Sequence, residues 1–417
     1  MISDTDRKNA MNTIIIAQCF GQVAGLCFVN GLMFNYLTSL NISEQAMVIY
    51  LRLPSIIGLF ITLPMAYLSD AKGKSKLGQI GNAIQVVGLG CLCMAAYVSG
   101  YQGLAVVGGI LLFSIGVALF NCSWFALLDP IIKPEQRGSF FAKLRTIWKL
   151  FGVTFTFIAQ LILEIQGDSV LSPLLMAVAV LAVIRMYYYQ KIPELEPRVK
   201  QGDGKHPSFK SEIKDLFKNK DFLTACILSF FMPIFFGELT LLFNFYEKLI
   251  LKFDSPDIVL MGNLAMIGGV CGFSAGAFGL KKMGEKKLFM ICTIMVSACL
   301  LFFPLHNYFN WIPTRVYAGF FTFLSGLSTA AMSIGITSMM LHLLPQKNKS
   351  LETSLFLTAQ EIGAGVSAGI LSLAIYFFEG STKTLSVIHV NVYTVYMAVL
   401  ALIIPIGIYL FNKKLKM

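Results

Sequence analysis

The sequence predicts an all-α membrane protein with twelve transmembrane helices, arranged as two pseudo-symmetric six-helix bundles with both termini in the cytoplasm. Three observations predict this class. The 417 residues are 56% hydrophobic and only 13% charged, with a mean hydropathy of +0.72, whereas a soluble domain carries about 25% charged residues. The apolar residues form stretches too long for the core helices of a soluble protein. A polar segment divides these stretches into two equal sets.

Each apolar stretch is long enough to cross a hydrocarbon core of about 30 Å at 1.5 Å per residue. The first six helices are predicted at residues 12–38, 46–68, 78–98, 103–127, 141–164 and 171–190. The second six are predicted at residues 222–247, 257–280, 288–305, 312–343, 353–378 and 390–411. The first stretch lacks a short apolar core followed by a small-residue cleavage site, so we expect a retained helix rather than a signal peptide.

The basic residues predict the orientation. With the N-terminus inside, most of the 33 Lys and Arg residues fall in the inner connections, as the positive-inside rule requires. The net charge of +11 therefore implies no nucleic acid partner, because topology and anionic lipid headgroups account for it. The predicted domains are an N-terminal bundle at 1–190, a basic cytoplasmic linker at 191–221 with an amphipathic helix near 208–220, and a C-terminal bundle at 222–417.

The cysteines, the histidines and one glycine-containing run argue against several other classes of protein. The nine cysteines all lie in predicted helices and the four histidines are scattered, so we expect no disulfide, metal or other cofactor. The run Gly73-Lys74-Ser75 resembles the end of a phosphate-binding loop, but that loop requires a glycine where Leu68 stands. We therefore expect neither an ATP-driven pump nor an enzyme.

Landmarks shared by the two halves indicate an internal repeat. One offset along the chain aligns Gly73 with Gly284, Pro134 with Pro345 and Gly152 with Gly363, and a slightly smaller one aligns Phe34-Asn35-Tyr36 with Phe243-Asn244-Phe245. Duplicated halves favour alternating access around a central site over a channel.

The twelve spans, the basic loops after the second and eighth helices and the long central loop resemble the major facilitator superfamily over essentially the whole chain. That family carries the pattern G-x-L-x-D-[RK]-x-G-[RK]-[RK] after its second helix. Four residues here match that pattern, and Ala66, Ala71 and Ser75 depart from it; the matching residues are Leu68, Asp70, Gly73 and Lys74. The stretch DPIIKPEQRGSFFAKLR at 129–145 also resembles the turn between the family's fourth and fifth helices.

The resemblance implies a cytoplasmic gate around the loop after the second helix. In the family, the equivalent of Asp70 bonds to the N-terminal end of the eleventh helix, where free N–H groups and the helix dipole favour a carboxylate. By resemblance Asp70 locks the outward-facing state, with Lys74 and Asp129 as charge partners. Gly73 and Arg137 are assigned to the same gate.

Ionisable residues at membrane depth are functional candidates, because a charge at a helix centre costs about 2.5–3.5 kcal/mol on insertion. Glu238 is the deepest acid, and Pro233 and Gly237 are expected to weaken the helix just before it. Glu238 either carries a coupling proton or forms a buried ion pair with an arginine such as Arg52 or Arg315. Glu361, in the eleventh predicted helix, is the second proton-coupling candidate.

Polar residues on several predicted helices are candidates for contacting a solute. The amides and Trp124 are candidates because helices 1, 4, 7 and 10 line the cavity in the family. Arg145 and Lys149, one turn apart on the fifth helix, share a face and suggest an anion-binding or inner-gate surface. The alternative is that amides hold neighbouring helices together, and that basic side chains reach the inner headgroups. The cavity candidates are Gln18, Gln22, Asn30, Asn121, Trp124, Arg145, Trp148, Lys149, Asn244 and Gln360.

Together these features predict a secondary transporter that moves a small polar organic solute, anionic or sugar-like, by proton symport. We expect a monomer in the cytoplasmic (inner or plasma) membrane, with the solute, protons and membrane lipids as its partners. Two alternatives stay open. An exporter of amphiphilic or hydrophobic compounds or lipids is suggested by the 35 phenylalanines, and a sensor or scaffold of the same fold would not transport at all.

Overall fold

The computed structural model describes residues 4–72, 74–128, 130–133, 137–195, 220–343, 349–378, 383–385 and 388–414. Nearly all of these residues are helical, because in lipid each backbone N–H and C=O group must be bonded within the protein. Two short strands, β1 (Lys383–Leu385) and β2 (Ile388–Val390), pair antiparallel. The hydropathy pattern did not predict this hairpin.

Six spans precede the central linker. The first span consists of α1 (Asp4–Cys27) and α2 (Leu32–Ser39), so the single helix predicted over 12–38 is wrong in this detail. It is followed by α3 (Glu44–Lys72), α4 (Lys74–Ala95), α5 (Gln102–Leu128), α6 (Arg137–Gln166), the short 3₁₀ helix η2 (Gly167–Val170) and α7 (Leu171–Gln190). Most of the predicted linker, with its amphipathic helix, lies outside the described residues.

Six further spans follow. The seventh is divided into α9 (Lys220–Phe236) and α10 (Leu239–Leu249). The eighth and ninth form α11 (Ser255–Phe302), which turns at Gly284 where φ is 78°. The last elements are the 3₁₀ helix η3 (Phe303–Phe309), α12 (Thr314–Leu343), α13 (Lys349–Phe378) and α14 (Val392–Lys414).

The described helices account for twelve spans. Nine stretches are long and apolar enough to cross a membrane; two of them, Lys143–Gln190 and Ser255–Phe309, each contain two spans, and Val392–Pro405 is a shorter apolar helix. The prediction of a twelve-helix, all-α membrane fold is confirmed.

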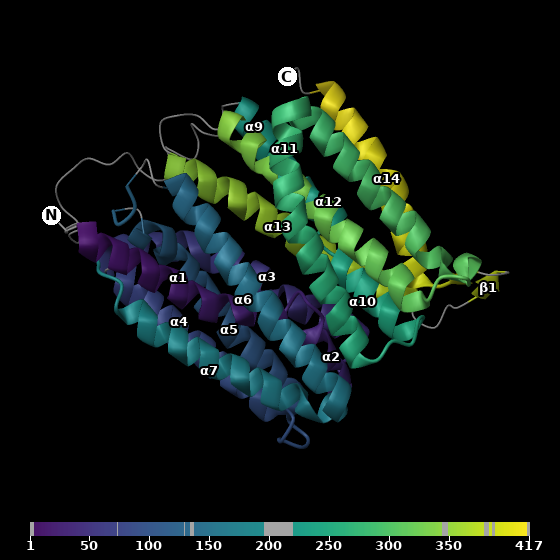
Figure 1. Cartoon of the computed structure of the whole chain (residues 1–417), viewed down its shortest axis with the longest axis horizontal. Helices are drawn as coiled ribbons and strands as arrows, with labels where there is room; N and C mark the ends of the chain where they lie inside the picture. The colour runs from purple at the N-terminus through teal and green to yellow at the C-terminus, as the bar shows by residue number, and fades with distance from the viewer. Residues whose placement is uncertain are drawn as a thin grey trace.

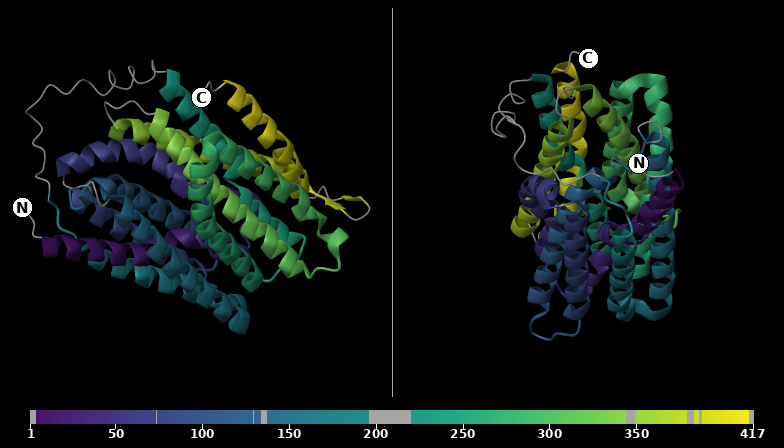
Figure 2. Two further views of the ribbon diagram at one scale, coloured as in Figure 1. Left: turned by 45° about the horizontal axis from the view of Figure 1, so that its top comes forward. Right: turned by 90° about the vertical axis from the view of Figure 1, so that its left-hand side faces the viewer.

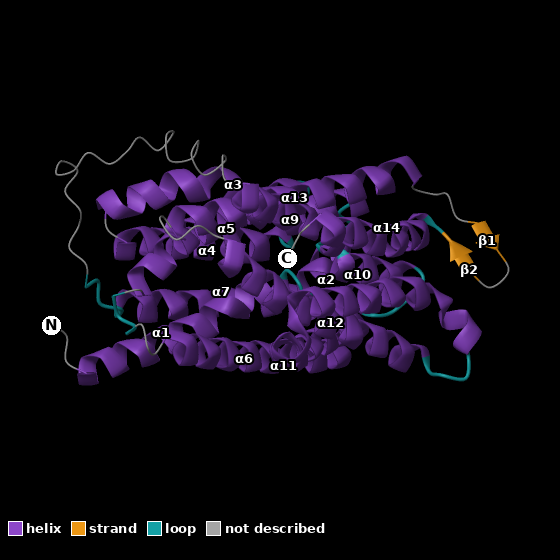
Figure 3. Ribbon diagram, turned by 90° about the horizontal axis from the view of Figure 1, so that it is seen from above, coloured by secondary structure: helices purple, strands orange, loops and turns teal. Residues whose placement is uncertain are grey.

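The helices form two bundles that lie side by side. In Figure 1 the helices α1–α7, coloured from purple to teal-blue, make one bundle and the helices α9–α14, coloured from teal to yellow, make the other, and both views of Figure 2 show the same division. Figure 3 shows α3 beside α13 along one side of the molecule and α6 beside α11 along the other, and both pairs are in contact. The hairpin lies at the end of the molecule opposite the N-terminus.

Three glycines of α11 allow this helix to pack closely against α12. Gly268, Gly272 and Gly276 of α11 each face the backbone of α12, at Phe323, Leu327 and Ala331. A side chain at any of these three positions would collide with that backbone. The small-residue face predicted here is therefore a packing seam between α11 and α12.

Contacts between the bundles occur near the end that carries the hairpin, which we call the outer end. Phe34 of α2 packs edge-on against Phe245 of α10, with ring centroids 5.1 Å apart. The Asn35 side-chain amide donates a 3.0 Å hydrogen bond to the Ser255 carbonyl at the start of α11. Tyr393 of α14 donates to the Glu44 carboxylate of α3. These contacts close the outer end of the molecule.

Candidate functional site

The first and seventh spans are both interrupted. In the first, Gly31 has the left-handed φ of 89°, and the Leu32 N–H that begins α2 donates to Asn30 Oδ1 at 3.2 Å. In the seventh, the Gly237 N–H bonds to the Pro233 carbonyl at 2.7 Å, after which Glu238 separates α9 from α10. Pro233 and Gly237 explain the second break, because proline removes a helical hydrogen bond and glycine ends helices readily.

These two breaks occupy corresponding positions in the repeat. The offset that aligns Phe34 with Phe243 also aligns Val29 with Glu238. Interrupted spans at matching positions of two repeats are where transporters place their solute and ion sites, because unwound backbone is tolerated at membrane depth only where it is buried or lines a cavity.

Glu238 is paired with Arg52 across the two bundles. Arg52 Nε of α3 lies 2.8 Å from Glu238 Oε1, and the Glu238 side chain is 1% exposed against 25% for Arg52. Arg52 also donates to the Gly237 carbonyl at the break. Neither carboxylate oxygen of Glu238 accepts a well-aligned hydrogen bond, so the contact with Arg52 is electrostatic. Arg315, the other arginine considered as its partner, pairs instead with Asp257 at 3.0 Å.

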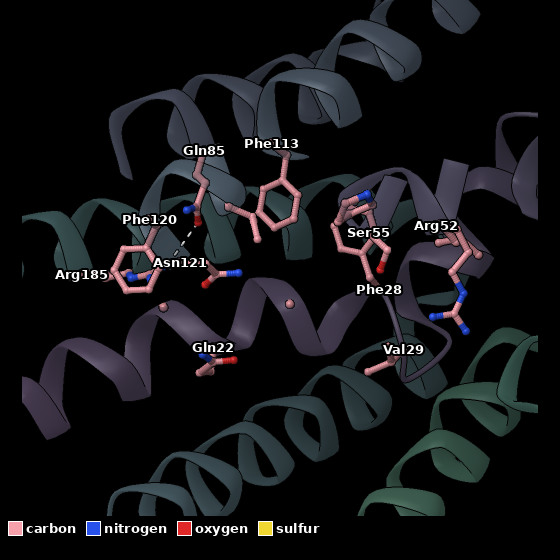
Figure 4. A pocket seen from close by; sticks show the side chains of 15 residues that line it. Gln22, Phe28, Val29, Arg52, Ser55, Gln85, Phe113, Phe120, Asn121 and Arg185 are labelled. Carbon is pink, nitrogen blue, oxygen red and sulfur yellow. Dashed lines mark hydrogen bonds between the residues drawn. The ribbon is translucent and has the colours of Figure 1, made fainter. Parts of the chain in front are cut away.

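A cavity of about 290 Å³ lies inside the first bundle, and we call it the N-bundle cavity. Figure 4 shows its lining, with Arg185 and Arg52 far apart and the rings of Phe28 and Phe113 between them. Those two rings are stacked with centroids 4.9 Å apart. The polar groups that line this cavity are Gln22, Arg52, Ser55, Gln85, Asn121 and Arg185.

A second cavity of about 350 Å³ lies between the bundles, and we call it the interbundle cavity. Its wall combines α1 and α6 with α10, α11 and α12. Val29, at the break of the first span, lines both cavities. The site therefore extends from the interface into the first bundle, farther than the four helices expected from the family resemblance.

Lys149 is the charged residue of the interbundle cavity. Its ammonium lies 3.8 Å from the ring centroid of Phe273 on α11 and 5.9 Å from that of Trp148. No described carboxylate pairs with Lys149. The side chain therefore crosses from one bundle to the other and holds its charge beside an aromatic face, an arrangement that stabilises a partly desolvated cation.

Arg185 of α7 is a site residue that the sequence pattern did not single out. It is buried, with 5% of its surface exposed. Its Nη1 donates to Gln85 Oε1 at 3.1 Å, and its guanidinium carbon lies 3.7 Å from the ring centroid of Phe120. Its position five residues from the inner end of α7 is typical of an arginine that reaches the headgroups. The signal available in the sequence was Gly21, whose missing side chain leaves room for the Arg185 stem.

The other cavity candidates separate into three groups. Gln22 and Asn121 line the N-bundle cavity. Gln18, Asn30, Trp124 and Asn244 are buried among packed helices, where Trp124 stacks on Tyr189 and lies tilted by 33° against Phe120. The remaining candidates line neither cavity: Arg145 and Gln360 are exposed, and Trp148 is half-buried. Glu361, the second proton-coupling candidate, is also half-buried and lines neither cavity.

Little of the predicted cytoplasmic gate falls within the described residues. Gly73 and Asp129 lie outside them, and the side chains of Asp70 and Arg137 are likewise not described. Lys74 begins α4, and its backbone N–H donates to Glu194 Oε1 at 2.7 Å. The gate therefore remains a prediction.

The electrostatic character of the two cavities is positive. Arg52, Arg185 and Lys149 contribute to their walls, and none of the described lining residues is acidic. Glu238 lies behind Arg52 and offsets that one charge. Among the described residues, no group of three His, Cys, Asp or Glu side chains could hold a metal ion.

Comparison with solved structures finds similar folds over nearly the whole chain. The nucleoside transporter NupG is 15% identical with a TM-score of 0.68, covering 98% of this chain and 100% of its own. A POT family transporter in complex with a thioalcohol-conjugated peptide is 11% identical with a TM-score of 0.76, covering 98% and 97%. A D-xylose-proton symporter is 14% identical with a TM-score of 0.72, covering 98% of each chain. No curated protein sequence matches the chain.

The sequence itself matches the profile of one family. The match extends over residues 14–368 and carries the description Major Facilitator Superfamily. It agrees with the twelve spans, the two bundles and the interrupted first and seventh spans. The chain belongs to the Major Facilitator Superfamily and is an integral, multi-pass membrane transporter.

Proposed function

We propose that the protein takes up a small polar organic solute together with protons across the cytoplasmic membrane, by alternating access. The observation that carries this proposal is the ion pair between Arg52 and Glu238. It joins the two bundles at the break of the seventh span, and Arg52 also lines the N-bundle cavity. This ion pair therefore links the N-bundle cavity, through Arg52, to a buried acid of the other bundle.

A proton on Glu238 would alter the balance between conformations. The ionised carboxylate attracts Arg52 and favours the arrangement in which the outer end is closed, whereas a neutral carboxyl group loses most of this attraction. A ligand that binds one conformation better shifts the equilibrium towards it, so a proton that opens the pair favours separation of the bundles at their outer ends. The described structure then corresponds to the inward-facing state.

The bodies that move in the proposed cycle are the two bundles, residues 1–190 and 222–417. Glu361 and the gate around Asp70 remain candidates for further control of this movement. The comparison proteins include a nucleoside transporter and a D-xylose-proton symporter. Similarity to these transporters supports a small solute and, for the symporter, proton coupling. Membrane lipids surround the monomer, and its exposed aromatic and aliphatic side chains suit that environment.

Uptake into proteoliposomes tests this function. Radiolabelled nucleosides, pentoses, peptides and small organic acids are offered with and without an inward proton gradient. We expect one class to accumulate only with the gradient, and Glu238→Gln to abolish accumulation while exchange of labelled for unlabelled solute persists. Glu164→Gln is the matched control, because Glu164 is an exposed acid of α6 that accepts from Gln160.

Other outcomes would assign another function. Uptake that ignores the gradient and survives Glu238→Gln would eliminate symport through Glu238. Stabilisation by hydrophobic drugs, but by no polar solute, would favour the exporter. Absence of transport for the whole panel would favour a sensor or scaffold.

A further inference from the structure

Arg185 carries a buried positive charge that the protein leaves without an opposite charge. Its partners in the described structure are a neutral amide, Gln85, and an aromatic ring, Phe120. No described carboxylate pairs with it, and its Nε has no hydrogen-bond partner. Burial of an unpaired charge is unfavourable, so a residue of this kind implies a compensating function.

Snorkelling does not explain this residue. A guanidinium near the inner end of a span normally extends towards the headgroups, but Arg185 is only 5% exposed and points towards α4 and α5. The stem passes Gly21 of α1, where a side chain would occupy the same space. Helix α1 is therefore shaped to let Arg185 reach the N-bundle cavity.

The N-bundle cavity contains the groups that recognise an acid. Arg185 lies near the amides of Gln85 and Asn121, with Gln22 across the cavity (Figure 4). Arg52 also lines this cavity, but its charge is balanced by Glu238. The uncompensated charge of the cavity is therefore the one on Arg185. At about 290 Å³, the space is at the small end of ligand sites.

We propose that Arg185 binds the acidic group of the transported solute, which is therefore a small organic anion whose apolar or planar body lies against Phe28 and Phe113. This inference rests on the proposed transport function. The guanidinium donates charge-assisted hydrogen bonds to the acid, and the amides of Gln22 and Asn121 contact its polar substituents. Binding neutralises the buried charge, so solutes without an acidic group are rejected because they leave Arg185 unpaired.

Binding to the purified full-length protein in detergent tests this assignment. The probes are anions with neutral counterparts. Benzoate against benzamide and acetate against acetamide are pairs of equal shape that differ in charge, and phenyl phosphate is compared with phenol, which lacks the acidic group. We expect at least one anion to raise the melting temperature in a saturable manner while its neutral counterpart does not. A larger shift with benzoate than with phenyl phosphate assigns the site to carboxylates, and the reverse order assigns it to phosphate monoesters.

Variants separate binding by Arg185 from general attraction of anions. Arg185→Gln should weaken anion binding about tenfold or more, as expected for loss of a charge-assisted hydrogen bond, and Arg185→Lys should retain part of it. Lys191→Gln is the matched control: it removes one positive charge from the inner end of the same helix, where Lys191 lies over the Tyr187 ring outside the cavity.

The proposal is overturned if no probe pair is distinguished by charge in the wild-type protein, a result that needs no variant to fold. It is equally overturned if folded Arg185→Gln or Arg185→Lys binds anions with the wild-type affinity. The binding assay uses no proton gradient, so its failure is distinct from a failure of proton-coupled uptake in proteoliposomes.

Discussion

The carboxylate of Glu238 lies in the apolar interior of the protein and is paired with Arg52 of the other bundle. Its position in the seventh span identified it from the sequence, because an acid in the apolar interior is costly. Its partner could not be chosen from the sequence, since Arg52 and Arg315 both fell in predicted spans. The structure selects Arg52 because the break at Gly237 brings the carboxylate and a free carbonyl to the same guanidinium.

The pair should show its coupling in stability measurements. Arg52→Gln leaves a buried carboxylate without its counter-charge and Glu238→Gln leaves a partly exposed guanidinium, so we expect the first to lower the melting temperature more. The double variant should be more stable than the sum of both losses predicts, with a coupling of about 0.5–3 kcal/mol. Strictly additive losses in thermal unfolding would show that the two residues do not interact.

Arg185 was overlooked for a physical reason. Sequence position gives the depth of an arginine but not the direction of its long side chain, and near a helix end outward snorkelling is the common outcome. The direction depends on space left by another helix, here at Gly21.

A side chain at Gly21 should therefore disturb Arg185. In Gly21→Ala the new methyl group overlaps the Arg185 stem, so we expect a loss of about 1–3 kcal/mol, as for other overpacked sites. Gly25→Ala, one turn along α1, is the stability control, because its nearest neighbour would be Gln22 Oε1 at 3.9 Å. Equal melting temperatures for the two variants would contradict the close approach of Arg185 to α1.

The sequence predicted the length and order of the helices well, because hydropathy depends only on the residues within a short stretch of the chain. It predicted that Pro233 and Gly237 weaken the seventh helix just before Glu238, but it predicted neither the division of that span into α9 and α10 nor the break in the first span. No proline marks that site. Gly31 and the alignment of Val29 with Glu238 were the available signals, and each alone is weak.

The break in the first span should depend on Gly31. Its φ of 89° is unfavourable for other residues, and a side chain there would meet Ile258 of α11. Gly31→Ala should therefore lower stability by about 1–2 kcal/mol or more. Gly90→Ala in α4 is the control, since nothing lies within 4 Å of the new methyl group, and it should raise stability by about 0.5–1 kcal/mol. A Gly31→Ala variant as stable as Gly90→Ala in thermal unfolding would contradict the left-handed backbone at Gly31.

For the whole molecule, twelve spans and two bundles follow from the sequence, but the conformation does not. The state of a transporter depends on contacts between residues far apart in the chain, and hydropathy contains no information on them. In this structure the contacts Phe34–Phe245, Asn35–Ser255 and Tyr393–Glu44 join the outer ends of the bundles. The closed outer end and the Arg52–Glu238 pair belong to one state of the molecule.

In the proposed transport cycle the two bundles rock about the cavity, and Glu238 controls the motion. Double electron–electron resonance tests it with spin labels on exposed residues, Ser39 with Asp254 at the outer end and Lys143 with Lys281 at the inner end. In Glu238→Gln, which mimics the protonated acid, we predict a longer outer distance and a shorter inner distance than in the wild type. Distances that stay the same, or change in the same direction at both ends, would show that Glu238 does not control a rocking motion of the bundles.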